Sequence, residues 1–195
     1  MSSLFLRKSF YFIRHGETDW NKAQKVMGQS DISLSENGIS QAQVVAEKIK
    51  ALPIDIIISS SLKRAWVTAE IIGNKIHRPI IIENNLKECC WGAMEGKIKG
   101  DCSYNGIPFE PEKWWQQGIV PKGAESFITF SNRVIKITND HLAINKNILF
   151  VAHGGVIMSI LKAIGSPSWN IENVALYHFI APEVGESSWN VNIIK

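Results

Sequence analysis

The sequence predicts an α/β fold in which a mostly parallel sheet is covered by helices on both faces. Several short apolar runs rich in Ile, Val and Phe show no alternation, which is typical of parallel strands buried on both sides. Helical periodicity fills the intervals between them, and alternating strands and helices are typical of the α/β class. The four runs that we expect to form strands are residues 10–13, 54–58, 79–82 and 148–152.

Two further strands are expected near the C-terminus, over residues 174–180 and 189–194. The second of these alternates, and it places Trp189, Val191 and Ile193 on one side. Alternation is typical of a strand with one face in water, so we expect an edge strand there.

Four helices are expected between the strands, because apolar residues recur at spacings of three and four. Ser35 and Ser61 precede the first two helices, and a serine hydroxyl is a preferred acceptor for the free N–H groups of a first turn. The apolar positions are Ile39, Ala42, Val45, Ile49 and Leu52, then Leu62, Ala65, Trp66, Ala69 and Ile72, then Phe127, Phe130, Val134 and Ile137, and last Val156, Ile157, Ile160 and Leu161.

The 195 residues are enough for one domain, and we expect a single domain over residues 1–195. Residues 96–123 differ from the rest, because they are rich in Gly, Pro and Lys, lack periodicity and contain Trp114 and Trp115. A long irregular segment inside a compact domain is often a lid or a binding loop. A surface excursion whose tryptophans pack on the body fits the sequence equally well.

Composition argues against several classes of protein. The net charge is +3 and the basic residues are scattered, so we expect no nucleic-acid partner. No apolar stretch approaches the ~20 residues of a membrane span, so we expect no membrane partner. Three cysteines, with Cys89 and Cys90 adjacent, fit neither a disulfide framework nor a zinc pattern. These features favour a soluble, cytoplasmic protein.

Polar residues follow three of the predicted strands. Arg14 and His15 follow the first, two serines end the second, and His153 and Gly154 follow the last. Ligands of open α/β sheets lie beyond the carboxyl ends of the strands. We therefore expect these side chains to line one crevice.

This crevice has the chemistry of a phosphoryl site. Arg64, at the start of the second helix, would join Arg14, His15 and His153 there, and Gly154 would offer a backbone N–H. The planar fork of arginine matches phosphate oxygens. The neighbouring cations would keep His15 neutral, and a neutral imidazole is a competent nucleophile. We therefore expect His15 to accept the phosphoryl group.

A leaving alkoxide needs a proton, and Glu88 is the candidate donor. A carboxyl group drawn partly out of water beside a phosphate dianion would have a raised pKa and could serve as a general acid. Glu95 competes for this role, and Glu17 is a more distant candidate.

The chain resembles the histidine phosphatase superfamily, the phosphoglycerate mutase-like group. A bare RHG triplet is a weak signal, but several blocks in the same order and approximate spacing are a strong one. The four blocks are "RHGETDWN", "SSSLKRAWVTAEII", "LKECCWGAMEG" and "VAHGG", and two more are "GQSDISLSENGISQA" and "PKGAESFITFSNR".

The resemblance implies a three-layer α/β/α sandwich and a phosphohistidine intermediate on His15. It also implies no metal, no other cofactor, and Glu88 as proton donor and then as base for the incoming water. The implied phosphate pocket comprises Arg14, Asn21, Arg64 and His153, and Thr18 and Gly28 match positions that often touch substrate. Two departures concern substrate fit: Met27 stands where many phosphatases have Gln, and Ala124 is an extra residue in the usual GES block.

Three functions compete for this chain, and the favoured one is a metal-independent phosphatase of the histidine acid type. It would act on a small phosphorylated metabolite. The resemblance implies that the mutases clamp a substrate carboxylate with an Arg pair, whereas no Arg lies between Arg78 and Arg133 here, and "ECCWG" replaces ERHYG. A non-catalytic phosphate-binding module ranks last, because His15 and Glu88 are both present. Trp20, Trp114 and Trp115 favour a substrate with a flat or apolar part; the sequence leaves the substrate and the oligomeric state open.

Overall fold

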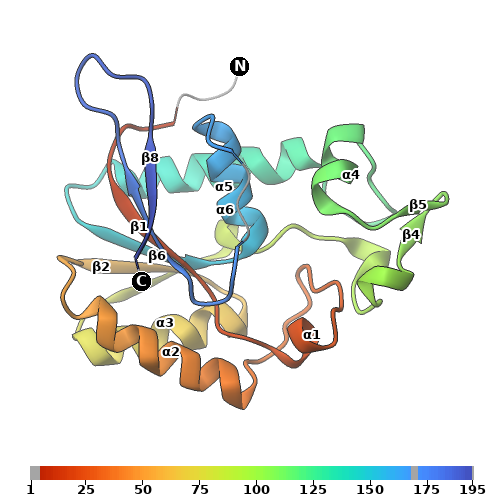
Figure 1. The fold of residues 1–195 in the computed structure, drawn as a ribbon, viewed down its shortest axis with the longest axis horizontal. Helices are drawn as coiled ribbons and strands as arrows, with labels where there is room; N and C mark the ends of the chain where they lie inside the picture. Colours follow the sequence, from red (N-terminus) through yellow and green to blue (C-terminus); the bar gives the residue numbers. More distant parts are fainter. Residues whose placement is uncertain (1–4, 168–170, 195) are drawn as a thin grey trace.

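The structure is a computed structural model that describes residues 5–167 and 171–194. A six-stranded sheet forms its centre, in the order β3-β2-β6-β1-β7-β8. The first four of these strands are parallel, and the hairpin of β7 and β8 is added antiparallel to β1 (Figure 1). The strands are β1 Phe10–Arg14, β2 Ile56–Ser60, β3 Ile80–Glu83, β6 Ile148–Ala152, β7 Leu176–Ile180 and β8 Asn190–Ile194.

Helices cover both faces of the sheet and complete the three-layer sandwich. The helices α2 (Glu36–Ile49) and α3 (Lys63–Ile76) lie on one face, and α5 (Phe127–Leu142) and α6 (Gly154–Ala163) lie on the other (Figure 1). A short helix α1 (Asp19–Lys22) follows β1. The predicted α/β class and mostly parallel sheet are therefore confirmed.

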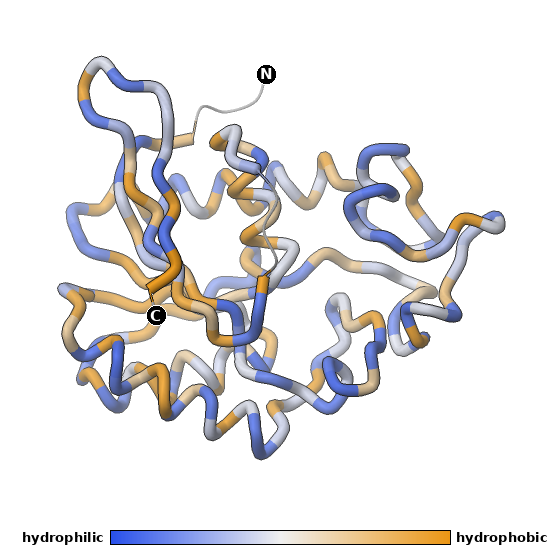
Figure 2. The backbone as a smooth tube through the Cα atoms, in the orientation of Figure 1, coloured by the Kyte–Doolittle hydropathy of each residue, from blue (hydrophilic) through white to orange (hydrophobic). Residues whose placement is uncertain are grey.

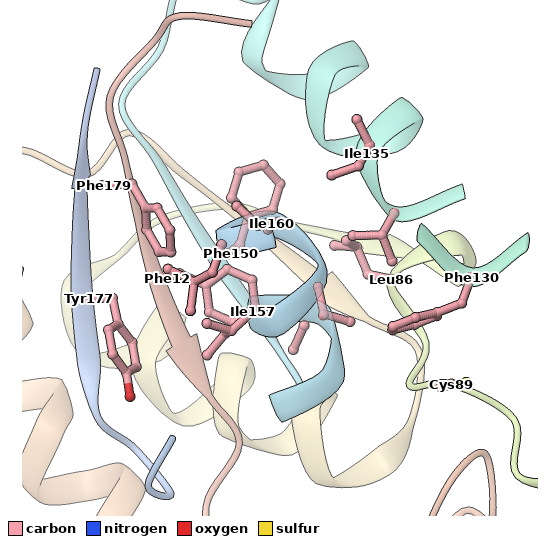
Figure 3. Packing of buried hydrophobic residues seen from close by; sticks show 14 of the residues in the cluster. Phe12, Leu86, Cys89, Phe130, Ile135, Phe150, Ile157, Ile160, Tyr177 and Phe179 are labelled. Atoms are coloured by element: carbon pink, nitrogen blue, oxygen red, sulfur yellow. The ribbon is translucent and has the colours of Figure 1, made fainter. Parts of the chain in front are cut away.

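Alternate residues of each central strand enter different cores. Phe10 and Phe12 face α5 and α6, whereas Tyr11 and Ile13 face α2 and α3. Figure 2 shows these strands as hydrophobic stretches inside the molecule, and Figure 3 shows Phe12 among the side chains of the α5–α6 core, with Phe150 of β6 beside it. The absence of alternation in the sequence thus reflects burial on both faces.

The starts of the first two predicted helices differ. Ser35 caps α2 as predicted, with its hydroxyl accepting a hydrogen bond from the Gly38 N–H. The prediction that Ser61 caps α3 is wrong, because the N-cap is Leu62 and makes no side-chain cap bond. The Asp31 carboxylate instead accepts from the Lys63 N–H at 2.7 Å. A residue distant in sequence therefore satisfies this helix start.

Both edge strands are partly exposed. The predicted buried strand at residues 79–82 is β3, an edge of the sheet, and its Ile81 and Ile82 are exposed. The expected edge strand at the C-terminus is confirmed as β8, where Val191 is buried and Ile193 is exposed. An apolar run with no alternation can thus also occupy an edge.

Residues 96–123 hold short elements. These are η3 Lys99–Asp101, β4 Ser103–Tyr104, β5 Ile107–Pro108 and α4 Pro111–Gln117, and they follow η1 Asn84–Leu86 and η2 Gly92–Met94. The segment packs beside the start of α5, where the rings of Trp115 and Phe127 lie 4.9 Å apart (Figure 1). Trp114 is fully buried, and its indole N–H donates to the Pro108 carbonyl. The segment therefore extends the core as well as the surface.

Candidate active site

A cavity of about 220 Å³ opens beyond the carboxyl ends of the central strands. β1 and β6 are paired in parallel up to Arg14 and Ala152, so the residues that follow both strands leave the sheet together. Of the predicted site residues, those that line the cavity are Arg14, His15, Asn21, Gly28, Arg64, Glu88 and Gly154. His153 is fully buried beside them, its ring 5.3 Å from that of His15.

The ring of His15 is held in one tautomer. Its Nδ1 lies 2.7 Å from the Gly16 carbonyl oxygen, which can only accept a hydrogen bond, so Nδ1 carries the proton. The Nε2 atom therefore keeps its lone pair. The backbone holds the residue as well, because its N–H donates to the Ala152 carbonyl at 3.0 Å and the Asn173 amide donates to its carbonyl at 2.8 Å.

His153 has one occupied and one free ring nitrogen. Its Nε2 lies 2.8 Å from the hydroxyl of Ser60, which ends β2. Its Nδ1 is buried and has no hydrogen-bond partner within the described part of the chain. A buried polar atom without a partner is costly, so this nitrogen is suited to a ligand.

The two arginines are anchored by carbonyl oxygens. Arg64 donates to Gly28 at 2.7 Å and to Ser30 at 2.8 Å, and Arg14 donates to Ile171 at 2.7 Å. In both residues the Nε atom is buried and finds no partner among residues 5–167 and 171–194. The guanidiniums are thus fixed in position before any anion arrives, and each keeps a free donor.

Burial and mutual repulsion lower the pKa values of this cluster. The pKa of His15 lies well below its ordinary value because of burial first and then the charges of Arg64 and Arg14. Burial and Arg64 likewise hold the pKa of His153 well below its ordinary range. Burial lowers the pKa of Arg64 to about 10, so it stays charged at neutral pH. The site therefore combines neutral imidazoles with charged guanidiniums.

Glu88 is part of the cavity wall. Its carboxylate accepts from the Cys89 N–H at 2.9 Å and from the Gly155 N–H, in the first turn of α6, at 3.0 Å. A Cβ atom at Gly155 would overlap the carboxylate, so this glycine allows the close approach. Among the carboxylates of the described chain, Glu88 alone lines the cavity.

The two competing carboxylates have structural partners and do not line the cavity. Glu95 accepts four hydrogen bonds, from the N–H groups of Gln29, Ser30 and Trp91 and from the Ser30 hydroxyl. Glu17 accepts from the Ser35 hydroxyl at the start of α2. Glu95 therefore shapes the loop that holds Arg64.

Two of the predicted site residues, Thr18 and Asn21, also have local structural roles. Thr18 is fully buried, caps α1 through its bond from the Asn21 N–H, and does not line the cavity. Asn21 lines the cavity, but its side-chain oxygen accepts from Thr18. Met27, one of the two departures, lines the cavity and contacts the Thr18 hydroxyl through its sulfur.

The tryptophans are placed unequally. Trp115 lines the cavity, whereas Trp20 and Trp114 do not. Trp91, which the sequence did not single out, lines it too and stacks on Trp115 with the rings 5.5 Å apart. Trp115 also stacks on Phe130, with the ring centroids 5.8 Å apart. This indole therefore packs against two other aromatic rings while it lines the cavity.

Two lysines in the cavity wall were also missed. Lys25 and Lys99 line the cavity, and the backbones of residues 24–26 and 97–99 bring them together through hydrogen bonds such as Lys99 N–H to Gln24 carbonyl at 2.8 Å. Neither ammonium forms an ion pair with a carboxylate in the part of the chain described here. Their proximity depends on backbone pairing between two segments distant in sequence, which no local sequence pattern indicates.

The described residues contain no group of three or more His, Cys, Asp or Glu side chains that could hold a metal ion. In residues 5–167 and 171–194 no helix has both the length and the apolar character needed to cross a membrane.

Comparison with curated proteins shows close relatives. The chain is 33% identical over 186 residues to the uncharacterized phosphatase PhoE of Bacillus subtilis, covering 92% of this chain and 90% of that protein. It is 34% identical over 169 residues to a probable phosphoglycerate mutase, GpmB, of Proteus mirabilis, covering 82% and 76%. Proteins named as a phosphatase and as probable mutases thus occur among its relatives.

Solved structures show the same fold. A phosphoserine phosphatase mutant of Entamoeba histolytica in complex with phosphoserine matches with a TM-score of 0.78 and 27% identity over 95% of each chain. A mycobacterial glucosyl-3-phosphoglycerate phosphatase matches with a TM-score of 0.80 and 24% identity, over 96% of this chain and 98% of that one. The model of the histidine phosphatase superfamily (branch 1) matches residues 10–181. The chain therefore belongs to the histidine phosphatase superfamily, branch 1.

Proposed function

We propose that the protein is a metal-independent phosphomonoester phosphatase that works through a phosphohistidine on His15. The observation that carries the proposal is the set of free nitrogens in the cluster. Arg14 Nε, Arg64 Nε and His153 Nδ1 are buried without partners among the described residues, and the tautomer of His15 leaves its Nε2 lone pair free. Donors that converge around a nucleophile are suited to a phosphoryl group.

The reaction has two steps. In the first, His15 Nε2 attacks phosphorus, the bond to the ester oxygen breaks, and Glu88 gives that oxygen a proton. In the second, a water molecule attacks the phosphohistidine, Glu88 takes a proton from this water, and inorganic phosphate leaves. Arg14 and Arg64 neutralise the charge of the transferring group in both steps.

Lys25 and Lys99 suggest the class of substrate. The cavity holds two arginines and two lysines but a single carboxylate among the described residues, so its positive charge exceeds what one phosphoryl group balances. Trp115 already stacks on Trp91 and Phe130, which weakens the idea that it binds a flat aromatic substrate. A small phosphomonoester with a second anionic group fits better. Related solved proteins were crystallised with such compounds, phosphoserine in one case and 3-phosphoglyceric acid in another.

The test is hydrolysis by the purified protein in the presence of EDTA. We expect phosphate release from 4-nitrophenyl phosphate and from phosphoserine, loss of turnover in His15→Ala, and retention in His77→Asn, which changes an exposed histidine. Rapid quenching in alkaline SDS, in which a phosphohistidine is stable, after mixing with radiolabelled substrate should trap label on wild type and none on His15→Ala. Wild-type protein that releases no phosphate from a broad panel of phosphomonoesters would contradict the proposal.

The mutase alternative differs in where the phosphoryl group goes. A mutase returns it from the histidine to a phosphoglycerate, whereas a phosphatase passes it to water. Several relatives carry the name of probable phosphoglycerate mutase, so the two outcomes need separate assays. Incubation with 3-phosphoglycerate and 2,3-bisphosphoglycerate should give inorganic phosphate. Accumulation of 2-phosphoglycerate faster than phosphate would favour the mutase.

A further inference from the structure

Arg133 of α5 reaches across to the loop that carries Glu88. One terminal nitrogen of its guanidinium donates to the carbonyls of Asn85 at 2.8 Å and Lys87 at 2.7 Å. The other donates to the carbonyl of Glu88 itself at 3.0 Å. One side chain thus binds three backbone carbonyls of residues 84–90. Within this segment the structure has a single helical turn, η1.

Glu125 fixes the same guanidinium from the opposite side. Its two carboxylate oxygens accept from Nε and from a terminal nitrogen of Arg133, each at 2.8 Å. The backbone of Glu125 also donates to the Cys90 carbonyl at 2.8 Å. The two side chains are only 19% and 12% exposed, so this bidentate pair is partly withdrawn from water. Such a pair has one preferred geometry, which a lysine could not reproduce.

The support behind Arg133 is rigid. Ser126 caps α5 by accepting from the Thr129 N–H, and Phe130 and Val134, on either side of Arg133, are fully buried in the core. Gln29 adds a further bond to the Glu88 carbonyl at 3.1 Å. Arg133 therefore anchors the backbone of Glu88 to α5, a helix that is itself packed into the hydrophobic core.

We propose that Arg133 and Glu125 are a positioning pair that holds Glu88 where it can exchange a proton with the substrate. Neither side chain lines the cavity, so neither touches substrate. The inference rests on the proposed function, because it assumes that Glu88 protonates a leaving group. Positioning of this kind matters because a displacement of about 1 Å can lower a rate by about a hundredfold.

A positioning role predicts a dependence on the leaving group that general loss of structure would not produce. An alkyl phosphate needs a proton on its leaving oxygen, so displacement of Glu88 should strongly lower kcat/KM for this substrate. A 2,4-dinitrophenyl phosphate leaves as a stable anion and should be affected little. The pair should therefore influence kcat/KM in proportion to the basicity of the leaving group.

The experiment measures kcat/KM of Arg133→Met across alkyl and aryl phosphates of graded leaving-group pKa. We expect a loss of about a hundredfold for alkyl phosphates and less than about threefold for 2,4-dinitrophenyl phosphate. Glu88→Gln should give the same graded pattern with a larger loss. The double variant should be no worse than Glu88→Gln alone, because Arg133 acts through Glu88.

Two further variants keep the result interpretable. Lys136→Met lies on the same helix, pairs with exposed Asp140 and should leave the whole series unchanged. Glu125→Gln keeps the shape of the partner of Arg133 and removes its charge. Its loss of kcat/KM should also grow with the pKa of the leaving group, but less steeply than in Arg133→Met. This variant tests the proposal even where Arg133→Met does not fold. An equal loss for all leaving groups, or additive losses in the double variant, would overturn the positioning role while the phosphatase function stands. Wild-type protein that hydrolyses no phosphomonoester would overturn both.

Discussion

The imidazoles of His15 and His153 lie 5.3 Å apart, centroid to centroid, with their planes inclined at 58°. They come from distant parts of the chain and meet because β1 and β6 are neighbours in the sheet. Each ring has one nitrogen bonded to protein, the first to the Gly16 carbonyl and the second to the Ser60 hydroxyl. The remaining nitrogens are therefore available to one shared ligand.

Burial of these two histidines predicts a pH-dependent stability. Their pKa values in the folded protein lie well below the ordinary value, whereas the unfolded chain titrates near about 6.5. As the pH falls below about 6.5, the unfolded state takes up protons that the folded state does not, so the free energy of unfolding decreases. Each group contributes at most about 1.4 kcal/mol per pH unit. The measurement is urea unfolding between pH 7.5 and 5 in phosphate-free buffer.

A control separates this effect from other titrations. His153→Gln should reduce the pH dependence of the free energy of unfolding by about the contribution of one histidine. His77→Asn should leave this pH dependence unchanged, since His77 is exposed. A wild-type stability that stays constant from pH 7.5 to 5 would contradict the prediction.

Substitution of Arg64 should weaken anion binding. Arg64→Lys keeps a positive charge but loses the fixed Nε donor and the bonds to Gly28 and Ser30. Hydrogen bonds to charged groups contribute about 1.5–3 kcal/mol. The binding free energy of vanadate, an inhibitor that resembles phosphate, should therefore become less favourable by about that amount. The measurement is the inhibition constant of vanadate, with Lys63→Gln on the exposed side of the same turn as control. An unchanged constant would exclude Arg64 from the anion site.

The glycine pair at the start of α6 offers a test of how Glu88 is placed. In Gly155→Ala the new methyl group would overlap the Glu88 carboxylate and push it away from α6. At Gly154 the nearest atom to an added methyl group is Arg14 Nε at 3.9 Å, which is an ordinary contact. We expect kcat on an alkyl phosphate to fall much further in Gly155→Ala than in Gly154→Ala. Equal losses, measured on variants with matching thermal unfolding, would show that Glu88 needs no such placement.

Lys25 and Lys99 should affect substrates according to their charge. The double variant Lys25→Met with Lys99→Met should raise KM for phosphoserine, because it removes two positive charges from residues that line the cavity. An exposed ion pair contributes about 0.2–1 kcal/mol, so the expected rise in KM for loss of both lysines is about twofold to thirtyfold. The comparison substrate is phenyl phosphate, which carries no second anion. Parallel changes for both substrates would argue against a carboxylate at this position.

The sequence was sufficient to predict most of the fold and the proximity of His15 and His153. Buried strands followed directly by His15 and His153 are a local pattern, and the parallel sheet brings the ends of these strands together. The wrong prediction at Ser61 has a long-range cause, since Asp31 occupies the start of α3 instead. Ile81 and Ile82 were predicted to be buried because hydropathy does not distinguish a central strand from an edge strand.

The parts that escaped prediction depend on contacts between distant segments. Glu95 competed with Glu88 because both lie near the same loop, and the four bonds that occupy Glu95 come from residues as far away as Gln29. Lys99 reaches the cavity only through its pairing with the segment after α1. The link from Arg133 to Glu88 spans 45 positions and leaves no periodic trace in the sequence.

Glu88 and Cys89 are consecutive residues with different surroundings. The first lines the cavity, and the second, fully buried, belongs to the same core cluster as Leu86 and Phe130, which are labelled with it in Figure 3. A bulky ester that pressed the carboxylate outward would have to pull a thiol away from its apolar neighbours. The range of molecules that this pocket accepts is thus limited by how tightly the interior of the protein is packed, and mutations far from the entrance can alter it.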